Sequence, residues 1–360
     1  MFQGNFLDVG IGRPVTTKTG TMIELVSVTV LAFGVACLVS YALSRPTSPL
    51  NILDHPNERS LHNVPVPRTG GLAIWAGSVS AIAVAPLLFG TRGELMWIAG
   101  AALTVGIVSF MDDLSHVPVG LRLVAHAAAA GLLLAGGLGL QSSGLRGLDL
   151  ALPAAMVSVL SLLFVVGMVN LYNFMDGMDG FAGGMAVFGF GTLGLLGFLA
   201  GDKYFAALCW SIAAAAGGFL VWNFPPARIF MGDTGASVLG LMAAALSLWG
   251  DELGLFPLWM AILVFSPFVA DATVTLLRRI VRGERVWEAH RGHYYQRLVQ
   301  LGWGHRRTVL VEYLLMAGCG VTAIVLVKAS PTVQWLGLCF WGFIFTIGIC
   351  AVARLETGAR

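Results

Sequence analysis

The chain has 360 residues, 57% of them hydrophobic and only 11% charged, and its net charge is +2. A soluble domain of this size needs a far more charged surface, so the composition excludes one and indicates a protein with many membrane-spanning helices. The five cysteines all lie within apolar segments, and their odd number and irregular spacing argue against a disulfide framework or a zinc site.

Apolar segments long enough to cross a bilayer recur along the chain. We expect 11 of them, at residues 22–43, 70–89, 95–111, 119–139, 152–174, 180–200, 204–222, 234–250, 256–277, 308–328 and 333–353. The sequence therefore predicts an all-α, polytopic integral membrane protein with about 11 transmembrane helices. A single transmembrane domain would cover 22–353, after a polar N-terminal extension at 1–21 and before a tail at 354–360. Met22 could be the true start, and the first span is too long for a cleaved signal peptide.

Lysine and arginine are distributed unevenly between the two sides that successive spans define. One side carries 15 of them and the other carries six. Because basic residues concentrate on the cytoplasmic side of membrane proteins, the richer side is expected to be cytoplasmic. The N-terminus is then outside, the C-terminus is cytoplasmic, and the two longest polar loops, 44–69 and 278–307, are cytoplasmic too.

Five aspartates lie against the ends of apolar segments, and all of them fall on the predicted cytoplasmic face. They are Asp112, Asp113, Asp176, Asp179 and Asp233. An aspartate at mid-bilayer costs roughly 2.5–3.5 kcal/mol on insertion scales, so a cluster of such residues indicates a functional site. Acids in a hydrophobic setting also suggest a bound cation.

Two of these sites have simpler alternatives. Asp112 and Asp113 are adjacent carboxylates that repel each other, so at least one favours a nearby cation or a proton. The alternative for this pair is a solvated helix end. Asp233 stands just before the span 234–250, and the alternative for it is a helix N-cap with no further role.

The run NLYNFMDGMDGFAGG at 170–184 is the most specific segment. Asn170, Asn173, Asp176 and Asp179 follow one another at intervals of three, which places neighbours on one face of a helix. Oxygen ligands without cysteine or histidine suit Mg²⁺ or Mn²⁺ better than zinc. The alternative is a glycine-rich turn between two spans.

Loop 44–69 contains five prolines and cannot be a continuous helix. Its polar side chains include Arg59 and Arg68, which are candidate donors to a phosphate group. The alternative is a polar connector without a binding role.

Loop 278–307 carries eight arginines with aromatic residues between them. A segment at the membrane interface has the same composition, and this is the alternative interpretation. His290, Arg291 and His293 favour a binding role, because together they could grip a diphosphate. We expect no nucleic-acid partner.

Taken together, these segments resemble the polyprenyl-phosphate N-acetylhexosamine-1-phosphate transferases. The matching runs, in family order, are DHPNERSLHNVPVPRTGG, FMDDL, NLYNFMDGMDG, MGDTG and HRGHYYQRL, and the resemblance covers residues 54–300. It implies an enzyme of the bacterial inner membrane with its active site on the cytoplasmic face. Such an enzyme moves a sugar-1-phosphate from a UDP-N-acetylsugar to undecaprenyl phosphate in the lipid bilayer, releases UMP and needs Mg²⁺ or Mn²⁺. A homodimer is a possible assembly.

The resemblance also implies roles for individual residues, carried over by position. The implied catalytic residues are Asp112, Asp113 and Asp176, the implied metal ligands are Asp179 and Asp233, with Asp176 as an alternative ligand, and the implied substrate-binding residues are Asn173, His290, Arg291, His293, Arg59 and Arg68. In this scheme Asp112 and Asp113 face the lipid phosphate, and the histidine and arginine side chains contact the diphosphate of the sugar nucleotide.

Within the family, the chain looks nearer to the enzymes that start O-antigen or other surface polysaccharides than to the muramoyl-pentapeptide branch. That branch has a lysine shortly after its paired aspartates and a run of consecutive histidines, whereas this chain reads DDLSH and HRGH. It also departs from the family pattern at Ala236, because the expected serine is displaced to Ser237. This displacement leaves the role of a hydroxyl group at that step in doubt.

The expected mechanism is direct attack by a lipid phosphate oxygen on the sugar-linked phosphorus. Asp112 or Asp113 would deprotonate or orient the lipid phosphate, and a covalent aspartyl-phosphate route is the alternative. Two other protein classes also contain intramembrane acids. A cation-coupled transporter needs acids nearer mid-span and broken helices in repeated halves, and an intramembrane aspartyl protease could use Asp112 and Asp176 but has no need of Asp233.

Overall fold

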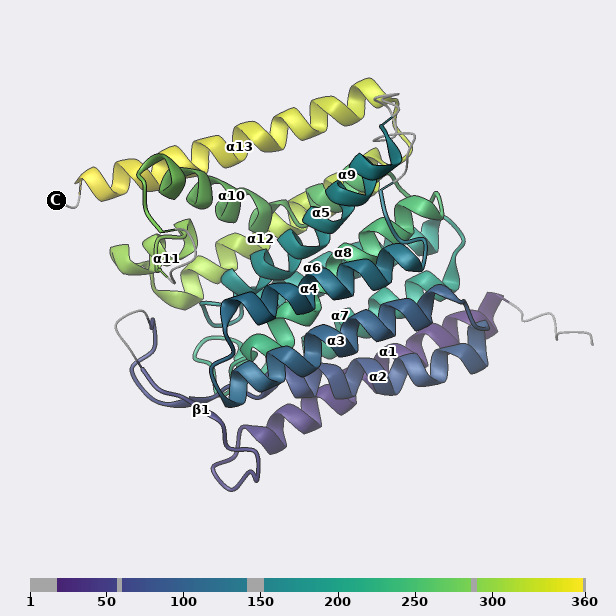
Figure 1. The fold of residues 1–360 in the computed structure, drawn as a ribbon, viewed down its shortest axis with the longest axis horizontal. Coiled ribbons are helices and arrows are strands. Elements are labelled where there is room, and N and C mark those ends of the chain that lie inside the picture. The colour runs from purple at the N-terminus through teal and green to yellow at the C-terminus, as the bar shows by residue number, and fades with distance from the viewer. Residues whose placement is uncertain (1–17, 57–59, 141–151, 286–289, 359–360) are drawn as a thin grey trace, which may run out of the picture.

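A computed structural model of the chain describes residues 18–56, 60–140, 152–285 and 290–358. Helices dominate these residues, and most of them run roughly side by side in one bundle (Figure 1). The helices are α1 (Lys18–Leu43), α2 (Gly70–Phe89), α3 (Glu94–Leu114), α4 (Val119–Ala135), α5 (Ala154–Phe174), α6 (Phe181–Leu199), α7 (Lys203–Asn223), α8 (Gly232–Glu252), α9 (Leu258–Val264), α10 (Ser266–Val281), α11 (Tyr294–Leu298), the π-helix η1 (Val299–Trp303), α12 (Gly304–Leu326) and α13 (Pro331–Gly358). The expected all-α class is therefore confirmed.

Eight helices of the described residues are long and apolar enough to cross a membrane, and a bent pair would make a ninth. The multi-pass membrane character predicted from composition is confirmed, while the count of 11 spans is not. Two expected spans are not among these eight helices. The span 119–139 corresponds to α4, which has only 17 residues, and the span 234–250 corresponds to α8, which is buried along nearly its whole length. Which end faces the cytoplasm stays a prediction.

The segment expected as one span at 256–277 is broken. The chain forms α9, ends it at Val264 and starts α10 at Ser266, with an angle of 80° between the two helices. Pro267 occupies the first turn of α10. Proline lacks a backbone N–H and clashes with the preceding turn, so it is tolerated where a helix begins and not within one.

The buried helix α8 forms the centre of the bundle and packs against α2, α3 and α5. Its first turn meets the first turn of α2 through two glycines. A Cβ on Gly71 would lie 2.3 Å from the backbone nitrogen of Gly235, so only glycine permits this approach. Small residues at such contacts let membrane helices pack closely.

The described residues of the polar loop at 44–69 form no helix, as the prolines of the loop predict. It contains two short antiparallel strands, β1 (Leu53–Asp54) and β2 (Val66–Pro67). The segment before α8 lies along β2, since the Phe230 N–H donates to the Pro67 carbonyl oxygen at 2.7 Å and the Gly70 N–H donates to the Phe230 carbonyl oxygen at 2.8 Å. These bonds hold the loop against the end of the bundle where α8 begins.

Candidate active site

One polar pocket, with a volume of about 420 Å³, lies where the loop containing β1 and β2 meets the ends of α3, α5 and α8. Four of the five predicted aspartates line it: Asp113, Asp176, Asp179 and Asp233. Other lining residues include Asp54, His62, Arg68, Phe230, Gln296 and His305. The structure therefore brings these four acids, which are distant in the sequence, to one pocket, as predicted.

Asp113 joins two helices. It lies in the last turn of α3 with only 3% of its surface exposed. Its Oδ1 accepts the backbone N–H of Asp233 at 3.0 Å, and its Oδ2 accepts the backbone N–H and the hydroxyl of Thr234 at 2.9 and 2.6 Å. The first N–H groups of a helix have no intrahelical acceptor, so a carboxylate from α3 here caps the N-terminus of α8.

This contact decides two of the simpler alternatives. The N-cap position of α8 belongs to Met231, and Asp233 lies inside the first turn. The interpretation of Asp233 as the N-cap is therefore wrong, since the capping carboxylate comes from Asp113 instead. The solvated helix end is wrong for Asp113 as well, because its side chain is buried.

Gly232 is required at the start of α8. Its φ is +73°, a left-handed conformation that residues with a side chain rarely adopt. A Cβ at this position would lie 2.5 Å from the Arg68 carbonyl oxygen and 3.0 Å from each carboxylate oxygen of Asp113. Glycine thus permits the close approach in which Asp113 of α3 binds the first turn of α8.

Asp112 does not line the pocket among the described residues, but an arginine links it to the site. The Arg122 Nη1 atom donates to Asp112 Oδ2 at 2.7 Å and lies 3.4 Å from Asp233 Oδ2. The other Asp112 oxygen accepts the Val117 N–H at 2.8 Å. Arg122 was not predicted as a site residue. A cation in the first turn of a predicted span, a few residues after two adjacent acids, was the available signal.

Asp233 is held from the other side by an amide. Asn173, in the last turn of α5, donates from Nδ2 to Asp233 Oδ1 at 2.9 Å and lies 3.4 Å from the Ser237 hydroxyl oxygen. The displaced serine therefore does lie within reach of the site, one helical turn beyond Asp233. The Asp233 side chain is 36% exposed, so it remains open to the pocket while Arg122 and Asn173 orient it.

The predicted stripe of amides and acids is not one helical face. Helix α5 ends at Phe174, so Asp176 and Asp179 lie in the glycine-rich turn before α6. Asn170 is directed elsewhere, since its Nδ2 donates to the Val166 carbonyl oxygen at 2.7 Å within the helix. The turn alternative is thus confirmed as local structure, and its two acids nevertheless line the pocket.

Asp179 is fixed by two partners that sequence reasoning missed. Its Oδ2 accepts the Ala227 N–H at 3.0 Å, and its Oδ1 lies 3.1 Å from His305 Nδ1. His305 stands in the predicted polar loop at 278–307, and its imidazole was a detectable candidate there. The pKa of Asp176 is raised well above its ordinary value, first by burial and then by the negative charges of Asp233 and Asp113.

The donor set fits a hard divalent cation that is held partly by its substrate. Among the described residues, no three His, Cys, Asp or Glu side chains come together as a closed metal cage. The pocket nevertheless gathers several carboxylates, and burial together with the negative charges of Asp233 and Asp113 raises the pKa of Asp176. Mg²⁺ commonly uses one or two carboxylates, several waters and phosphate oxygens, so a pocket lined by several carboxylates fits that mode of binding.

The arginines of the loop at 44–69 differ in what can be said of them. Arg68 lines the pocket, and its Nη2 donates to the Asp113 carbonyl oxygen at 2.8 Å. Arg59 lies outside the described residues. The predicted binding role of Arg68 therefore has a place in the structure, next to the acids.

Residues 290–296, called the histidine segment below, lie beside the pocket. His290, Arg291 and His293 are not among the described residues that line it, whereas Gln296 from the same segment is. His293 is 4% exposed, and its ring stacks on that of His290 with centroids 4.8 Å apart. Burial, and then the charges of nearby basic groups, lower the pKa of His290 to about 4, so its ring is neutral near pH 7.

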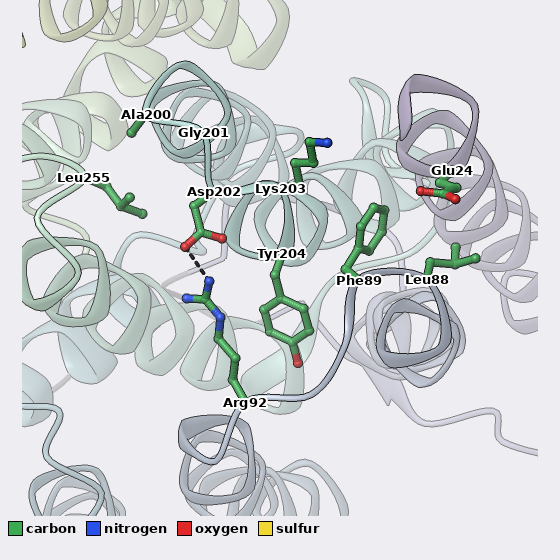
Figure 2. A pocket seen from close by; sticks show the side chains of 10 residues that line it. All are labelled: Glu24, Leu88, Phe89, Arg92, Ala200, Gly201, Asp202, Lys203, Tyr204 and Leu255. Atoms are coloured by element: carbon green, nitrogen blue, oxygen red, sulfur yellow. Dashed lines mark ion pairs between the residues drawn. The ribbon is translucent and has the colours of Figure 1, made fainter. Parts of the chain in front are cut away.

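A second polar pocket lies at the other end of α7, lined by Arg92, Asp202 and Tyr204 among others (Figure 2). Helix α7 has 21 residues, which makes it about 30 Å long, and its last residue, Asn223, lines the carboxylate pocket. Arg92 Nη2 and Asp202 Oδ2 pair at 2.7 Å (Figure 2), so these opposite charges neutralise each other. The concentration of acids distinguishes the first pocket as the candidate active site.

Known proteins are similar to this chain over the part that carries the five aspartates. Residues 95–251, which contain α3 to α8, match the model of glycosyl transferase family 4. The chain is 29% identical over 93% of its length to the probable undecaprenyl-phosphate N-acetylglucosaminyl 1-phosphate transferase of Bacillus subtilis, 92% of which is covered. It is 30% identical to the decaprenyl-phosphate N-acetylglucosaminephosphotransferase of Mycobacterium tuberculosis, with 78% of each chain covered.

A relative from another branch matches a shorter part of the chain. The phospho-N-acetylmuramoyl-pentapeptide-transferase of Listeria welshimeri is 30% identical over 35% of this chain and 38% of its own length. The first relatives instead cover most of the chain at comparable identity. The chain therefore belongs to glycosyl transferase family 4, among the polyprenyl-phosphate N-acetylhexosamine-1-phosphate transferases.

Proposed function

We propose that this protein transfers an N-acetylhexosamine-1-phosphate from a UDP-sugar to undecaprenyl phosphate, releases UMP and so starts a lipid-linked surface polysaccharide. The observation that carries the proposal is the pocket in which acids from the ends of α3 and α8 and from the α5–α6 turn converge. It lies at the end of an apolar bundle, where a lipid phosphate in the bilayer and a water-soluble nucleotide can meet. We place this end on the cytoplasmic side of the bacterial inner membrane, in line with the distribution of basic residues.

Asp179 and Asp233 are the proposed ligands of Mg²⁺ or Mn²⁺, with Asp176 close to both. The bound ion would supply positive charge to the phosphate oxygens, whose negative charge increases in the transition state. Arg122 and Asn173 orient the Asp233 carboxylate. Arg68, also in the pocket, adds a further cation beside the phosphates.

We propose direct attack by the lipid phosphate oxygen. In this step the oxygen forms a bond to the sugar-linked phosphorus, and the bond between that phosphorus and the oxygen of UMP breaks. A covalent route through Asp113 would break the three hydrogen bonds that hold the first turn of α8. Asp176 lines the pocket and makes none of these bonds to α8, so we propose that it orients or deprotonates the lipid phosphate. Asp112, which pairs with Arg122 outside the pocket lining, stays a predicted catalytic residue.

The other two classes fit the arrangement less well. A transporter requires acids near mid-span, whereas Asp113 lies in the last turn of α3 and Asp233 in the first turn of α8. An aspartyl protease based on Asp112 and Asp176 would leave the ordered surroundings of Asp233 without a purpose. A homodimer stays a prediction.

The deciding assay uses membranes that contain the protein, undecaprenyl phosphate and radiolabelled UDP-N-acetylsugars, each with and without EDTA. We expect a lipid-linked product with at least one sugar, only in the presence of a divalent ion, and none with Asp233→Asn. An Arg92→Met variant, altered in the pocket at the opposite end of α7, is the matched control and is expected to be fully active. Product formation in EDTA, or normal turnover by Asp233→Asn, would contradict the proposed metal site.

A further inference from the structure

Asp271 is a buried carboxylate outside the pocket, in α10 just beyond the 80° bend. It is 9% exposed. Its Oδ1 accepts the Thr275 hydroxyl at 3.0 Å and the Tyr294 N–H at 3.0 Å, and its Oδ2 accepts the Tyr295 N–H at 3.1 Å. His293 Nδ1 also lies 3.1 Å from Oδ1. Burying an ionised carboxylate is costly unless it is hydrogen-bonded, and here the donors come mainly from the segment that follows His290.

These bonds determine the position of the short helix α11. The N–H groups of Tyr294 and Tyr295 belong to its first turn, which has no intrahelical acceptors for them. A carboxylate on α10 satisfies both, although it is 23 and 24 residues away in the chain. The histidine segment is therefore attached to α10 by charge-assisted hydrogen bonds, which are roughly twice as strong as neutral ones.

The same carboxylate selects the proton position on His293. A carboxylate only accepts, so the 3.1 Å contact with Asp271 requires a proton on His293 Nδ1, and in a neutral ring Nε2 is then an acceptor. The stacked ring of His290 has the opposite tautomer. Its Nδ1 accepts the Gly292 N–H at 3.1 Å, so its Nε2 carries the proton. The histidine segment thus has His290 Nε2 as a donor and, when the His293 ring is neutral, His293 Nε2 as an acceptor.

Helix α11 in turn contacts the acidic turn between α5 and α6. Tyr295 is fully buried, and its hydroxyl lies 3.4 Å from the Phe174 carbonyl oxygen. A Cβ on Gly177 would lie 2.3 Å from that hydroxyl oxygen, so the turn and the helix fit closely. Gln296, the next residue, lines the pocket. A displacement of α11 would therefore move Tyr295, which packs on the turn between α5 and α6, and Gln296, which lines the pocket.

We propose that Asp271 is a positioning residue of the transferase, one that fixes the histidine segment at the pocket and holds His293 in its Nδ1–H tautomer. The inference rests on the proposed function and on the expectation that the histidine segment contacts the diphosphate of the sugar nucleotide. Asp271 does not touch the substrate in this role; it acts through His293 and α11. Loss of its charge then weakens nucleotide binding and leaves the lipid acceptor site intact.

The kinetic test compares Asp271→Asn with the parent enzyme in detergent. Asparagine keeps the size of the side chain but presents an NH₂ group to one of the N–H donors. We expect the KM for the UDP-sugar to rise at least about tenfold, the change that one lost charge-assisted hydrogen bond produces. The KM for undecaprenyl phosphate and kcat should change less than about threefold, because uniform binding of the nucleotide is what is lost. Equal losses for both substrates, or unchanged kinetics, would overturn the proposal.

Two further variants separate positioning from general damage. Thr275→Val removes one donor to Asp271 and leaves its bonds to the histidine segment, so it is expected to bind the UDP-sugar like the parent protein. Asp271→Glu retains the carboxylate and should recover part of the lost affinity. A Thr275→Val defect as large as that of Asp271→Asn would show that packing in α10, and not the anchoring of the segment, is responsible.

A spectroscopic readout does not depend on the identity of the donor sugar. In protein labelled with ¹⁵N-histidine, the His293 signals, assigned by their loss in His293→Gln, should report a protonated Nδ1. In Asp271→Asn that signature should disappear or broaden. If the signature is present but no UDP-sugar is turned over, the proposed donor is wrong while the role of Asp271 stands. If His293 is protonated on Nε2 instead, the role of Asp271 is wrong whatever the substrate.

Discussion

The Asp113 carboxylate on α3 accepts the backbone N–H of Asp233 on α8, with 3.0 Å between nitrogen and oxygen. One of the two adjacent acids in the sequence thereby places the acid that opens to the pocket. Its neighbour, Asp112, pairs with Arg122 instead. Two carboxylates that are equivalent in sequence therefore have different tasks, and substitutions should separate them.

Asp113→Asn is expected to destabilise the protein by about 1.5–3 kcal/mol, since a buried charged acceptor of three hydrogen bonds is lost. Activity should fall at least about a hundredfold, because the orientation of α8 and of Asp233 is disturbed. Asp112→Asn is the matched control. Its ion pair with Arg122 is partly exposed, so its effect on stability should stay under about 1 kcal/mol. Unfolding in detergent and the transfer assay measure both effects, and equal destabilisation by the two variants would contradict the assigned roles.

Gly232→Ala should abolish transfer and lower the unfolding temperature. The substitution combines a strained positive φ with contacts of 2.5 Å and 3.0 Å to Arg68 and Asp113. Gly201→Ala is the comparison, because Gly201 also has a positive φ, of 92°, but a Cβ there meets nothing within 4 Å. It should cost about 1–2 kcal/mol through strain alone and keep full activity. An active Gly232→Ala enzyme would mean that the close approach of α3 and α8 is not needed.

Arg122→Met should lower kcat about ten- to a hundredfold, since Asp112 and Asp233 lose the cation between them and repel each other. Arg122→Lys should retain part of the activity, because it keeps the charge but not the planar guanidinium. The same change at the opposite end of α7, Arg92→Met, also removes an ion pair and should leave kcat unaltered. Steady-state kinetics with saturating lipid acceptor would test this, and an equal loss in both methionine variants would argue against a local role for Arg122.

Binding of Mn²⁺ should weaken as the pH is lowered across the range in which the protein stays folded, because metal ligands must lose their protons. Asp176 has a raised pKa, so it takes up a proton at a pH where an ordinary aspartate is ionised. Asparagine cannot take up this proton, so the pH dependence of the Mn²⁺ affinity should be weaker in Asp176→Asn. Electron paramagnetic resonance of free Mn²⁺ measures the affinity without requiring turnover. A wild-type affinity that is constant over this range would contradict the prediction.

Much of the fold was accessible from the sequence, because membrane helices show themselves as long apolar runs. The break between α9 and α10 was not, although Pro267 was visible, since a proline in an apolar run can either kink a helix or start a new one. The choice depends on what lies beyond it. Here Asp271, five residues after the start of α10, accepts two N–H groups of α11, a contact that the sequence does not reveal.

The candidate site divides in the same way. Composition and the positions of the five aspartates determined that acids gather at one end of a helical membrane bundle, because a charge in hydrocarbon is too costly to place without a partner. Only the tertiary structure decided that Asp113 caps α8, that Arg122 and Asn173 hold Asp233, that His305 meets Asp179 and that Asp271 anchors the histidine segment. These contacts join residues from 22 to 120 or more positions apart and depend on angstrom-scale distances, which the sequence encodes only through the packing of the whole bundle.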